Sequence, residues 1–301
     1  MVEASLRPTW CWVPARNQLL ILVFGKTGQV AQELQRFDRV VALGRADADL
    51  SDPQACKDII RGFAPKAVIN AAAYTAVDRA EDEEALATVI NGDAPKAMAQ
   101  ACAKLGVPLV HISTDYVFSG MGEKPWQPDD QTDPQNAYGR SKLAGETGII
   151  TSGAVHAILR TSWIVSAHGS NFVKTMLQLS ETRDAITVVA DQIGGPTPAS
   201  DIATACLEIA QQLIQDHSKT GTYHFSGAPA VSWADFAKHI FEQVGKSINV
   251  TRIPTKHYPT PVKRPLNSRM DCRTLKHTFG IQCPNWHNGL KEILRNLGAE
   301  A

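Results

Sequence analysis

A tyrosine and a lysine lie four residues apart in the stretch AYGRSKLAGE, at Tyr138 and Lys142. The stretch has a helical pattern, and residues at i and i+4 lie on one face of a helix about one turn apart. A tyrosine, with a usual pKa of about 10, is a poor proton donor near neutral pH, and a nearby ammonium lowers that pKa. Tyr138 could therefore act as a general acid, and the Lys142 ammonium could lower its pKa. Many surface helices carry such a pair by chance, so it needs further support.

Hydroxyl and acidic side chains follow a predicted strand upstream of this pair. The segment PLVHIST, residues 108–114, predicts a strand that ends in Thr114 and is followed by Asp115 and Tyr116. A hydroxyl at this end of a strand points into the crevice where α/β sheets bind ligands. Thr114 could hold a substrate carbonyl oxygen there, while a dihydronicotinamide delivers hydride to the carbonyl carbon.

A glycine-containing turn, GKTGQVA, joins the apolar run LLILVF (residues 19–24) to a helical pattern. Glycines in a strand-to-helix turn let the backbone approach the pyrophosphate of a dinucleotide, and the helix start supplies free N–H groups. The spacing GxxGxxA departs from the GxGxxG fingerprint, so a simple tight turn is the alternative. The candidate pyrophosphate contacts are Gly25, Lys26, Thr27, Gly28, Gln29 and Val30.

The end of the second strand bears on the choice between the two nicotinamide cofactors. An acid at that point bonds the ribose 2′-OH, whereas an arginine accommodates a 2′-phosphate. The sequence there is Leu43-Gly44-Arg45, so NADPH is favoured, with Arg45, Asp49 and Leu50 as candidate contacts. Arg45 could instead be solvated, and the nearby aspartates could neutralise it, so use of NADH stays open.

The third predicted strand ends in Ala71, Ala72 and Ala73. Small side chains at the carboxyl end of a strand leave room for a ligand, and this edge of an open α/β sheet is where ligands bind. We therefore expect the three alanines to line the cofactor site. Packing against a neighbouring helix would also favour alanine.

Strands and helices alternate along the first half of the chain. Short apolar runs predict strands, and longer amphipathic segments between them predict helices. The alternation indicates βαβ crossovers, and hence a Rossmann-type, doubly wound parallel sheet of the α/β class. The expected strands are 19–24, 39–43, 67–70, 108–114 and 156–161, and the later helices are 53–63, 82–104 and 137–151.

After residue 163 the predicted strands and helices no longer alternate regularly. This change indicates a smaller C-terminal substrate lobe. We expect an NAD(P)-binding Rossmann domain over 18–163, with 200–227 returning to it. The substrate-binding lobe then comprises 164–199 and 228–301. Residues 1–17 lack the continuous apolar segment of a secretory signal and are expected to be a disordered extension.

Composition narrows the class of partner. The 301 residues include 30 basic and 30 acidic ones, so net charge does not indicate nucleic acid or an anionic membrane as a partner. No apolar run approaches the roughly 20 residues needed to span a bilayer. The six cysteines are scattered without CxxC pairs, as in a cytoplasmic protein with reduced thiols. The composition therefore favours a small-molecule substrate over nucleic acid or a membrane as the partner.

Several strings together resemble one enzyme family. GxxGxxA, NAAA, STDYVF and YGRSK occur in the order typical of the extended short-chain dehydrogenase/reductases, whose signature is Tyr-x-x-x-Lys with an upstream Ser or Thr. Within that family, INAAAYTAVDRAE, ISTDYVFSG, AYGRSKLAGE and RPLNSRMD are similar to the dTDP-4-dehydrorhamnose reductases. The resemblance runs from residue 19 to residue 297.

The resemblance implies hydride transfer from NADPH, or NADH, to the C4 keto group of dTDP-4-dehydro-β-L-rhamnose, giving dTDP-L-rhamnose in dTDP-rhamnose biosynthesis. It implies Tyr138 as general acid, Thr114 as the group orienting the carbonyl, and Lys142 as the group that lowers the tyrosine pKa and holds the nicotinamide ribose. Implied sugar-nucleotide contacts are Thr75, Val77, Thr114, Asp115, Tyr116, Tyr138 and Trp163. An aromatic face such as that of Trp163 can stack on a sugar or base, although core packing is the common use.

The resemblance also bears on assembly. Some members of the family form magnesium-dependent homodimers through acidic residues, and Glu33 resembles one of these. A hard cation needs about six oxygen ligands, so one glutamate does not make a magnesium site.

Other functions remain open from the sequence. Epimerases and dehydratases of nucleotide sugars share this fold and keep their cofactor bound through the cycle. A non-catalytic regulatory subunit that binds NADP is an alternative of a different class, because fold alone does not establish activity.

Overall fold

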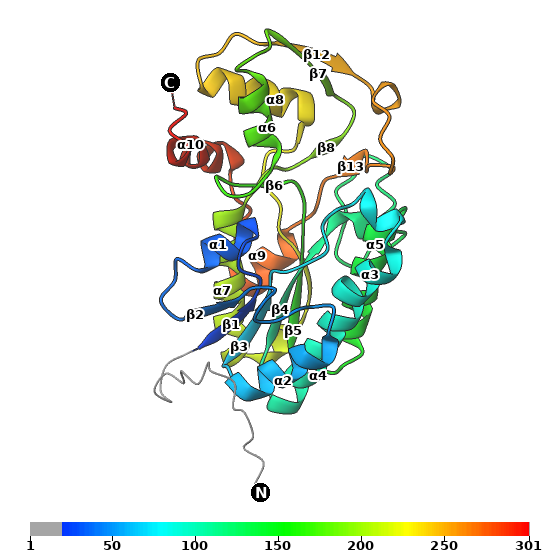
Figure 1. Cartoon of the computed structure of the whole chain (residues 1–301), viewed down its shortest axis with the longest axis vertical. Helices are drawn as coiled ribbons and strands as arrows, with labels where there is room; N and C mark the ends of the chain where they lie inside the picture. Colours follow the sequence, from blue (N-terminus) through cyan, green and yellow to red (C-terminus); the bar gives the residue numbers. More distant parts are fainter. Residues whose placement is uncertain (1–19, 301) are drawn as a thin grey trace, which may run out of the picture.

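The computed structural model describes residues 20–300, which form a larger and a smaller lobe stacked along the long axis of the molecule (Figure 1). The expected N-terminal extension, residues 1–17, lies outside the described residues. The larger lobe contains a six-stranded sheet, and the smaller lobe contains helices and short strands.

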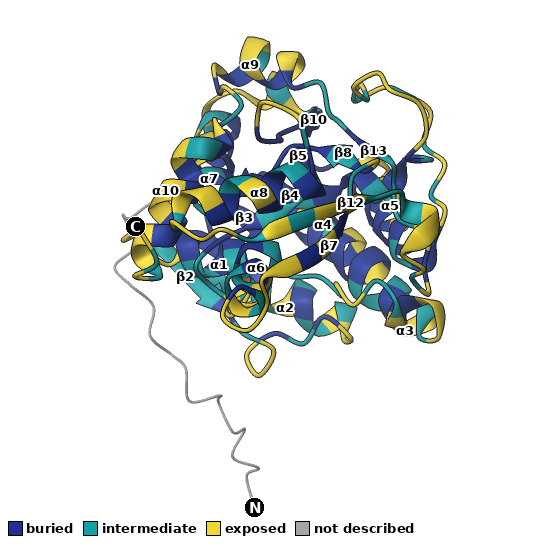
Figure 2. Cartoon of the chain, turned by 90° about the horizontal axis from the view of Figure 1, so that it is seen from above, coloured by how far each residue is buried: buried dark blue, intermediate teal, exposed yellow. Residues whose placement is uncertain are grey.

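The sheet of the larger lobe is parallel throughout, in the order β10-β5-β4-β3-β1-β2. Its central strands are buried between helices (Figure 2). This arrangement confirms the predicted α/β class and Rossmann-type sheet. The strands are β1 (Ile21–Phe24), β2 (Val40–Leu43), β3 (Ala67–Asn70), β4 (Leu109–Thr114), β5 (His156–Thr161) and β10 (Gly221–His224).

Helices cover both faces of this sheet. One face packs on α1 (Gln29–Leu34), α7 (Ala199–Gln215) and α9 (Arg273–Phe279). The other packs on α2 (Pro53–Phe63), α4 (Ala94–Leu105) and α5 (Ala137–Ile150).

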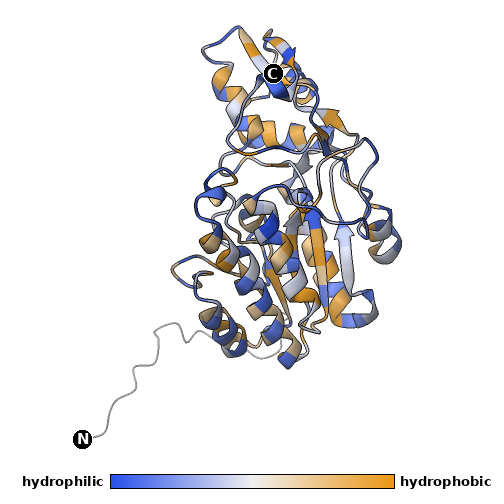
Figure 3. Ribbon diagram, turned by 90° about the vertical axis from the view of Figure 1, so that its right-hand side faces the viewer, coloured by the Kyte–Doolittle hydropathy of each residue, from blue (hydrophilic) through white to orange (hydrophobic). Residues whose placement is uncertain are grey.

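Strand β1 shows why an apolar run suits this position. Ile21 and Val23 point to the α1 and α7 face, while Leu22 and Phe24 point to the α2 and α4 face. A strand buried on both faces needs apolar side chains at every position, and orange segments accordingly occupy the interior of this lobe in Figure 3.

The strand order reverses between β1 and β3. The chain goes from β1 to its outer neighbour β2, and then crosses to β3 on the other side of β1. Ligands bind open α/β sheets in the crevice at such a switch point, beyond the carboxyl ends of the strands. The turn after β1 and the alanines after β3 therefore border one crevice.

The predicted helix over 82–104 is present as one continuous helical segment, but it contains a π-helical turn that the sequence pattern did not predict. The structure has α3 (Glu84–Thr88), a π-helical turn (Val89–Asp93) and then α4. The Asn91 side chain bonds the backbone N–H and C=O of Tyr74, at 2.8 and 3.0 Å. The backbone carbonyl of Asn91 packs closely against Gly145 of α5. These contacts with other segments hold the extra residue of the turn in place, and helical periodicity does not reveal them.

The smaller lobe has its own core. It forms between α6 (Phe172–Leu179), α8 (Trp233–Gln243) and α10 (Trp286–Asn296), which pack with the parallel pair β7 (Ala185–Val189) and β12 (Asn249–Ile253). Short strands connect the lobes: β6 (Ile164–Val165), β8 (Ile193–Gly194), β9 (Thr197–Pro198), β11 (Val231–Ser232) and β13 (Asn267–Ser268).

Two segments return from the C-terminal half to the larger lobe. Helix α7 packs on α1, and β10 extends the sheet beside β5. The lobe limits derived from the sequence stay predictions. No helix within residues 20–300 has the length and apolar character needed to cross a membrane.

Candidate functional site

A cavity of about 1480 Å³ lies between the carboxyl edge of the sheet and the smaller lobe. It is lined by every candidate site residue except Glu33. These residues are Gly25, Lys26, Thr27, Gly28, Gln29, Val30, Arg45, Asp49, Leu50, Ala71, Ala72, Ala73, Thr75, Val77, Thr114, Asp115, Tyr116, Tyr138, Lys142 and Trp163. Residues from distant parts of the sequence thus meet in one space large enough for two ligands side by side.

The turn between β1 and α1 lines the cavity with backbone atoms that a ligand can approach closely. Gly25 has a φ of +116°, which favours glycine, and a Cβ added there would lie 3.1 Å from the carbonyl carbon and oxygen of Ala71. Gly28 is the N-cap of α1 and offers no side-chain cap, so first-turn N–H groups stay available for a ligand. This backbone fits a dinucleotide pyrophosphate.

The outer end of the cavity carries exposed charges. Arg45 Nε lies 3.2 Å from Asp49 Oδ2; the Arg45 side chain is exposed, and that of Asp49 is partly buried. Asp47 Oδ2 accepts a hydrogen bond from Gly44 N at 3.0 Å and lies 4.0 Å from Lys26 Nζ. Arg45 and Lys26 could hold a 2′-phosphate here, because exposed pairs with aspartate are weak and exchange easily. Asp49, which lines the cavity, provides acceptors suited to a ribose hydroxyl.

The hydroxyl groups of Thr114 and Tyr138 meet at the inner end. Thr114, at the end of β4, donates to Asp115 Oδ1 at 3.1 Å and accepts from Tyr116 N at 3.2 Å. Ser268 donates to the other oxygen of Asp115 at 2.5 Å. Burial raises the pKa of Asp115 to about 6, against the lowering effect of these bonds. Thr114 is thus held by its neighbours in one orientation at the cavity wall.

Tyr138 occupies the second position of α5, where the Asn136 side chain caps the helix by accepting from Gly139 N at 2.8 Å. Burial raises the pKa of Tyr138, Asp115 and Tyr116 add to the increase, and a hydrogen bond with Thr114 opposes it. The structure thus differs from the expectation that Lys142 lowers this pKa. The physical reason is the direction of Lys142, which points towards β4.

Lys142 lies on α5 one turn after Tyr138 and is 2% exposed. Its Nζ donates to Ile112 O at 2.7 Å and lies 3.1 Å from His111 Nε2. Burial lowers the pKa of Lys142 to about 8, and Glu146 opposes this shift. The lysine is thus close to changing its charge near neutral pH.

Trp163 follows β5 and lines the cavity from the side of the smaller lobe. Its φ is +49°, which is uncommon for a bulky residue. Its ring stacks on Trp233 with centroids 3.5 Å apart, and a Cβ added at Gly194 would lie 2.8 Å from it. One face is therefore covered by protein, which fits the packing alternative, while the residue still borders the cavity.

Further cavity residues come from parts of the chain to which sequence reasoning assigned no site, among them Phe172, Trp233, Arg264 and Ser268. Arg264 bonds both oxygens of Asp78, at 2.8 and 2.7 Å. Ser268 holds Asp115, as described above. Arg264 and Ser268 both lie in the string RPLNSRMD, whose resemblance to the family was the one sequence signal for these two residues.

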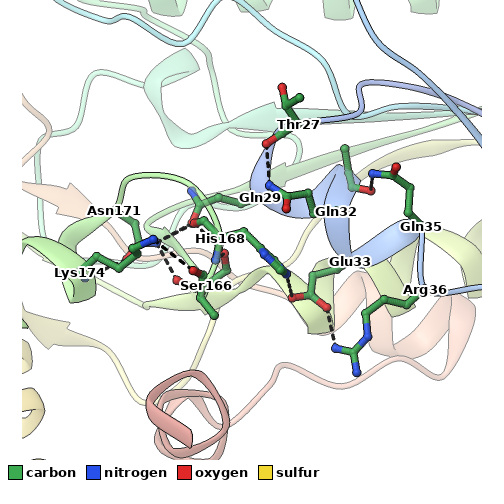
Figure 4. A network of polar contacts seen from close by, with 12 residues as sticks. Thr27, Gln29, Gln32, Glu33, Gln35, Arg36, Ser166, His168, Asn171 and Lys174 are labelled. Carbon is green, nitrogen blue, oxygen red and sulfur yellow. Dashed lines mark hydrogen bonds and ion pairs between the residues drawn. The ribbon is translucent and has the colours of Figure 1, made fainter. Parts of the chain in front are cut away.

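Glu33, the candidate magnesium ligand, lies outside the cavity. Its carboxylate accepts from Arg36 at 3.0 Å and lies 3.2 Å from His168 Nε2 (Figure 4). Asn171 donates to Gln29 Oε1 at 2.9 Å and so ties the same loop to α1. No cluster of three or more His, Cys, Asp or Glu side chains suited to a metal occurs within residues 20–300. The structure gives Glu33 basic partners in place of oxygen ligands.

The chain matches known proteins over almost its whole length. The family described as RmlD substrate binding domain matches residues 19–299. A dTDP-4-dehydrorhamnose reductase of Sinorhizobium fredii is 44% identical over 284 residues, covering 91% of this chain and 96% of that protein. The corresponding reductase of Escherichia coli K12 is 39% identical, covering 92% and 97%.

A solved structure is also similar to this chain over almost its whole length. The structure of dTDP-4-dehydrorhamnose reductase from Bacillus anthracis in complex with NADP matches with a TM-score of 0.86 at 34% identity. The match covers 93% of this chain and 99% of that chain.

Proposed function

Because the chain belongs to the family of dTDP-4-dehydrorhamnose reductases, we propose that it reduces the C4 keto group of dTDP-4-dehydro-β-L-rhamnose with NADPH to give dTDP-L-rhamnose. The observation that carries this proposal is the meeting of Thr114, Tyr138 and Lys142 in one cavity with the Gly25 turn. The NADP complex of the B. anthracis relative supports the choice of cofactor.

The residues of the chain divide the work. NADPH, when bound, supplies the hydride. Thr114 orients the carbonyl oxygen, and Tyr138 gives that oxygen its proton as negative charge develops on it. Lys142 points towards β4 but lines the same cavity, and it returns a proton to Tyr138 through the solvent of the cavity and not by direct contact. The raised pKa of Tyr138 keeps the phenol protonated before the reaction, as a proton donor requires.

The two ends of the cavity would hold different ligands. The cofactor would lie on the Gly25 turn and along Ala71, Ala72 and Ala73, and the sugar nucleotide would lie between Thr75, Val77, Asp115, Tyr116 and Trp163. The lobe limits given above, a cytoplasmic location and a homodimer belong to the same proposal. Light scattering with and without magnesium checks the dimer and its metal dependence.

A coupled assay tests the function. Purified protein is expected to oxidise NADPH only when the keto sugar nucleotide is supplied, with dTDP-L-rhamnose as product. Conversion of the sugar without net NADPH consumption would instead indicate an epimerase or a dehydratase. Tight NADPH binding without any turnover would indicate a regulatory subunit.

Arg45 is expected to favour NADPH over NADH. Replacing it with alanine removes a guanidinium available to a 2′-phosphate, and a hydrogen bond to a charged group contributes about 1.5–3 kcal/mol. We therefore expect Arg45→Ala to raise the KM for NADPH about 10- to 100-fold and to leave the KM for NADH nearly unchanged. Arg61→Ala is the matched control, because Arg61 forms a similar exposed pair with Asp58 at 3.1 Å outside the cavity. Equal loss with both cofactors would contradict the assignment.

A further inference from the structure

A buried row of polar side chains lies behind the catalytic lysine. Asn70 ends β3, His111 lies on β4, and Lys142 lies on α5. Asn70 Nδ2 is 3.1 Å from His111 Nδ1, and His111 Nε2 is 3.1 Å from Lys142 Nζ. Asn70 and His111 are fully buried. Neither side chain has a place in the mechanism described so far.

A backbone group sets the direction of the first bond in this row. Asn70 Oδ1 accepts from Ala72 N at 3.1 Å, so the amide nitrogen of Asn70 faces the imidazole. An amide NH₂ group only donates. His111 Nδ1 must therefore accept, and it carries no proton.

The tautomer of His111 follows. Burial lowers the pKa of His111 well below its usual range, so the ring is neutral. A neutral imidazole with a bare Nδ1 carries its proton on Nε2, and that N–H points at Lys142 Nζ. A neutral lysine amine can accept this hydrogen, whereas an ammonium presents only donors to it.

Other charged groups around the row have partners of their own. Glu146, one turn after Lys142, is bound by Arg160 at 2.7 Å and by Ser113 at 2.5 Å. His156, on β5, has its Nδ1 2.8 Å from Ala154 O. On the other side, Lys142 borders the cavity that Tyr138 also lines. Two groups contact Lys142 Nζ directly: Ile112 O can accept from either form of the lysine, whereas the Nε2–H of His111 can donate only to the neutral amine.

We propose that His111 is a positioning residue for Lys142, held by Asn70 in the tautomer whose Nε2–H stabilises the neutral amine left when Lys142 returns a proton to Tyr138. This role rests on the proposed function. The step balances: the ammonium loses one proton, the Tyr138 phenolate becomes a phenol, and solvent later restores the proton to Lys142. A lysine with a pKa of about 8 is suited to giving up a proton near neutral pH.

Reversing the tautomer gives the sharpest test. In Asn70→Asp one carboxylate oxygen can still accept from Ala72 N, and the other requires a proton on His111 Nδ1. His111 Nε2 then accepts from the Lys142 ammonium, and the added negative charge stabilises that ammonium as well.

Two measurements follow this change. Nitrogen NMR of protein labelled in its histidine rings is expected to show the His111 proton on Nε2 in the wild type and on Nδ1 in Asn70→Asp. In the reductase assay, the fall in kcat/KM on the alkaline side, where Lys142 loses its proton, is expected to move upward by about one pH unit or more.

Variants of His111 separate positioning from packing. His111→Phe fills the space but offers Lys142 no partner and leaves Asn70 unpaired, so kcat is expected to fall about 10- to 100-fold. His111→Gln keeps an N–H donor near the Nε2 position and is expected to recover most of this loss. His224→Gln, which replaces a buried histidine of β10 whose Nδ1 lies 3.0 Å from Trp126 O, is the control.

The outcomes are distinct. A wild-type proton on Nδ1, or an unchanged pH profile in Asn70→Asp, would overturn the proposal. Equal loss in His111→Phe and His111→Gln would do the same. The NMR measurement needs no substrate, so it still reports on the row if the protein reduces a different sugar or none.

Discussion

Tyr138→Phe is expected to lower kcat by about 10²- to 10⁴-fold with little change in KM for either ligand. The substitution removes one oxygen that forms a hydrogen bond with Thr114 at the inner end of the cavity. The loss corresponds to about 3–5 kcal/mol of transition-state stabilisation. Binding is expected to persist because the ring, which packs edge-on to Tyr116 with centroids 5.4 Å apart, is retained.

Tyr116→Phe is the matched control. Tyr116 lies beside Tyr138 and also lines the cavity, and burial raises its pKa to about 12. Since it is expected to contact the substrate without giving up a proton, its loss should raise KM more than it lowers kcat. Equal losses of kcat in the two variants would remove the case for Tyr138 as the proton donor.

The pH dependence separates Tyr138 from Lys142. Burial raises the pKa of Tyr138, so the phenol stays protonated across the usual assay range and does not itself cause loss of activity at moderately alkaline pH. Lys142, with a pKa lowered to about 8, loses its charge as pH rises through that value. We therefore expect kcat/KM for reduction to fall above about pH 8. A fall that begins only near pH 10 would contradict this assignment.

The position of these groups could be predicted because each follows a local signal. The Gly25 turn, the alanines after β3 and Thr114 after β4 all occupy the carboxyl ends of parallel strands. Such strand ends lie on one edge of the sheet. Tyr138 and Lys142 share a face of α5, because four residues make about one helical turn. The order of motifs was therefore sufficient to bring them together.

Other features depend on contacts that no local pattern records. His111 lies in a strand buried on both faces, so apolar alternation could not show that its ring faces Lys142. Trp233 enters the cavity from the smaller lobe, whose irregular elements gave no register. Glu33 was singled out for its residue type, whereas its contact with His168 depends on how α1 meets the loop after β6.

Gly25→Val is expected to abolish measurable NADPH binding, with a Kd at least about 100-fold higher. The φ of +116° at Gly25 is unfavourable for valine, and strain of this kind costs about 1–3 kcal/mol. The Cβ would lie 3.1 Å from the Ala71 carbonyl, and the two valine methyl groups extend further from it. Either the turn shifts or β1 and β3 separate at the switch point, and both changes destroy the surface proposed for the pyrophosphate.

Gly106→Val is the control that separates the effect of backbone strain on stability from the effect of Gly25→Val on NADPH binding. Gly106 also has a positive φ, +66°, but it ends α4 and a Cβ added there meets nothing within 4 Å. Both variants are expected to unfold at lower temperature, whereas only Gly25→Val should lose NADPH in a fluorescence titration. Gly28→Ala should lie between them, since its Cβ would be 3.9 Å from Ala71 O, an ordinary contact. If Gly25→Val bound NADPH as well as Gly106→Val does, the turn after β1 would be a tight turn and the cofactor would have to bind elsewhere in the cavity.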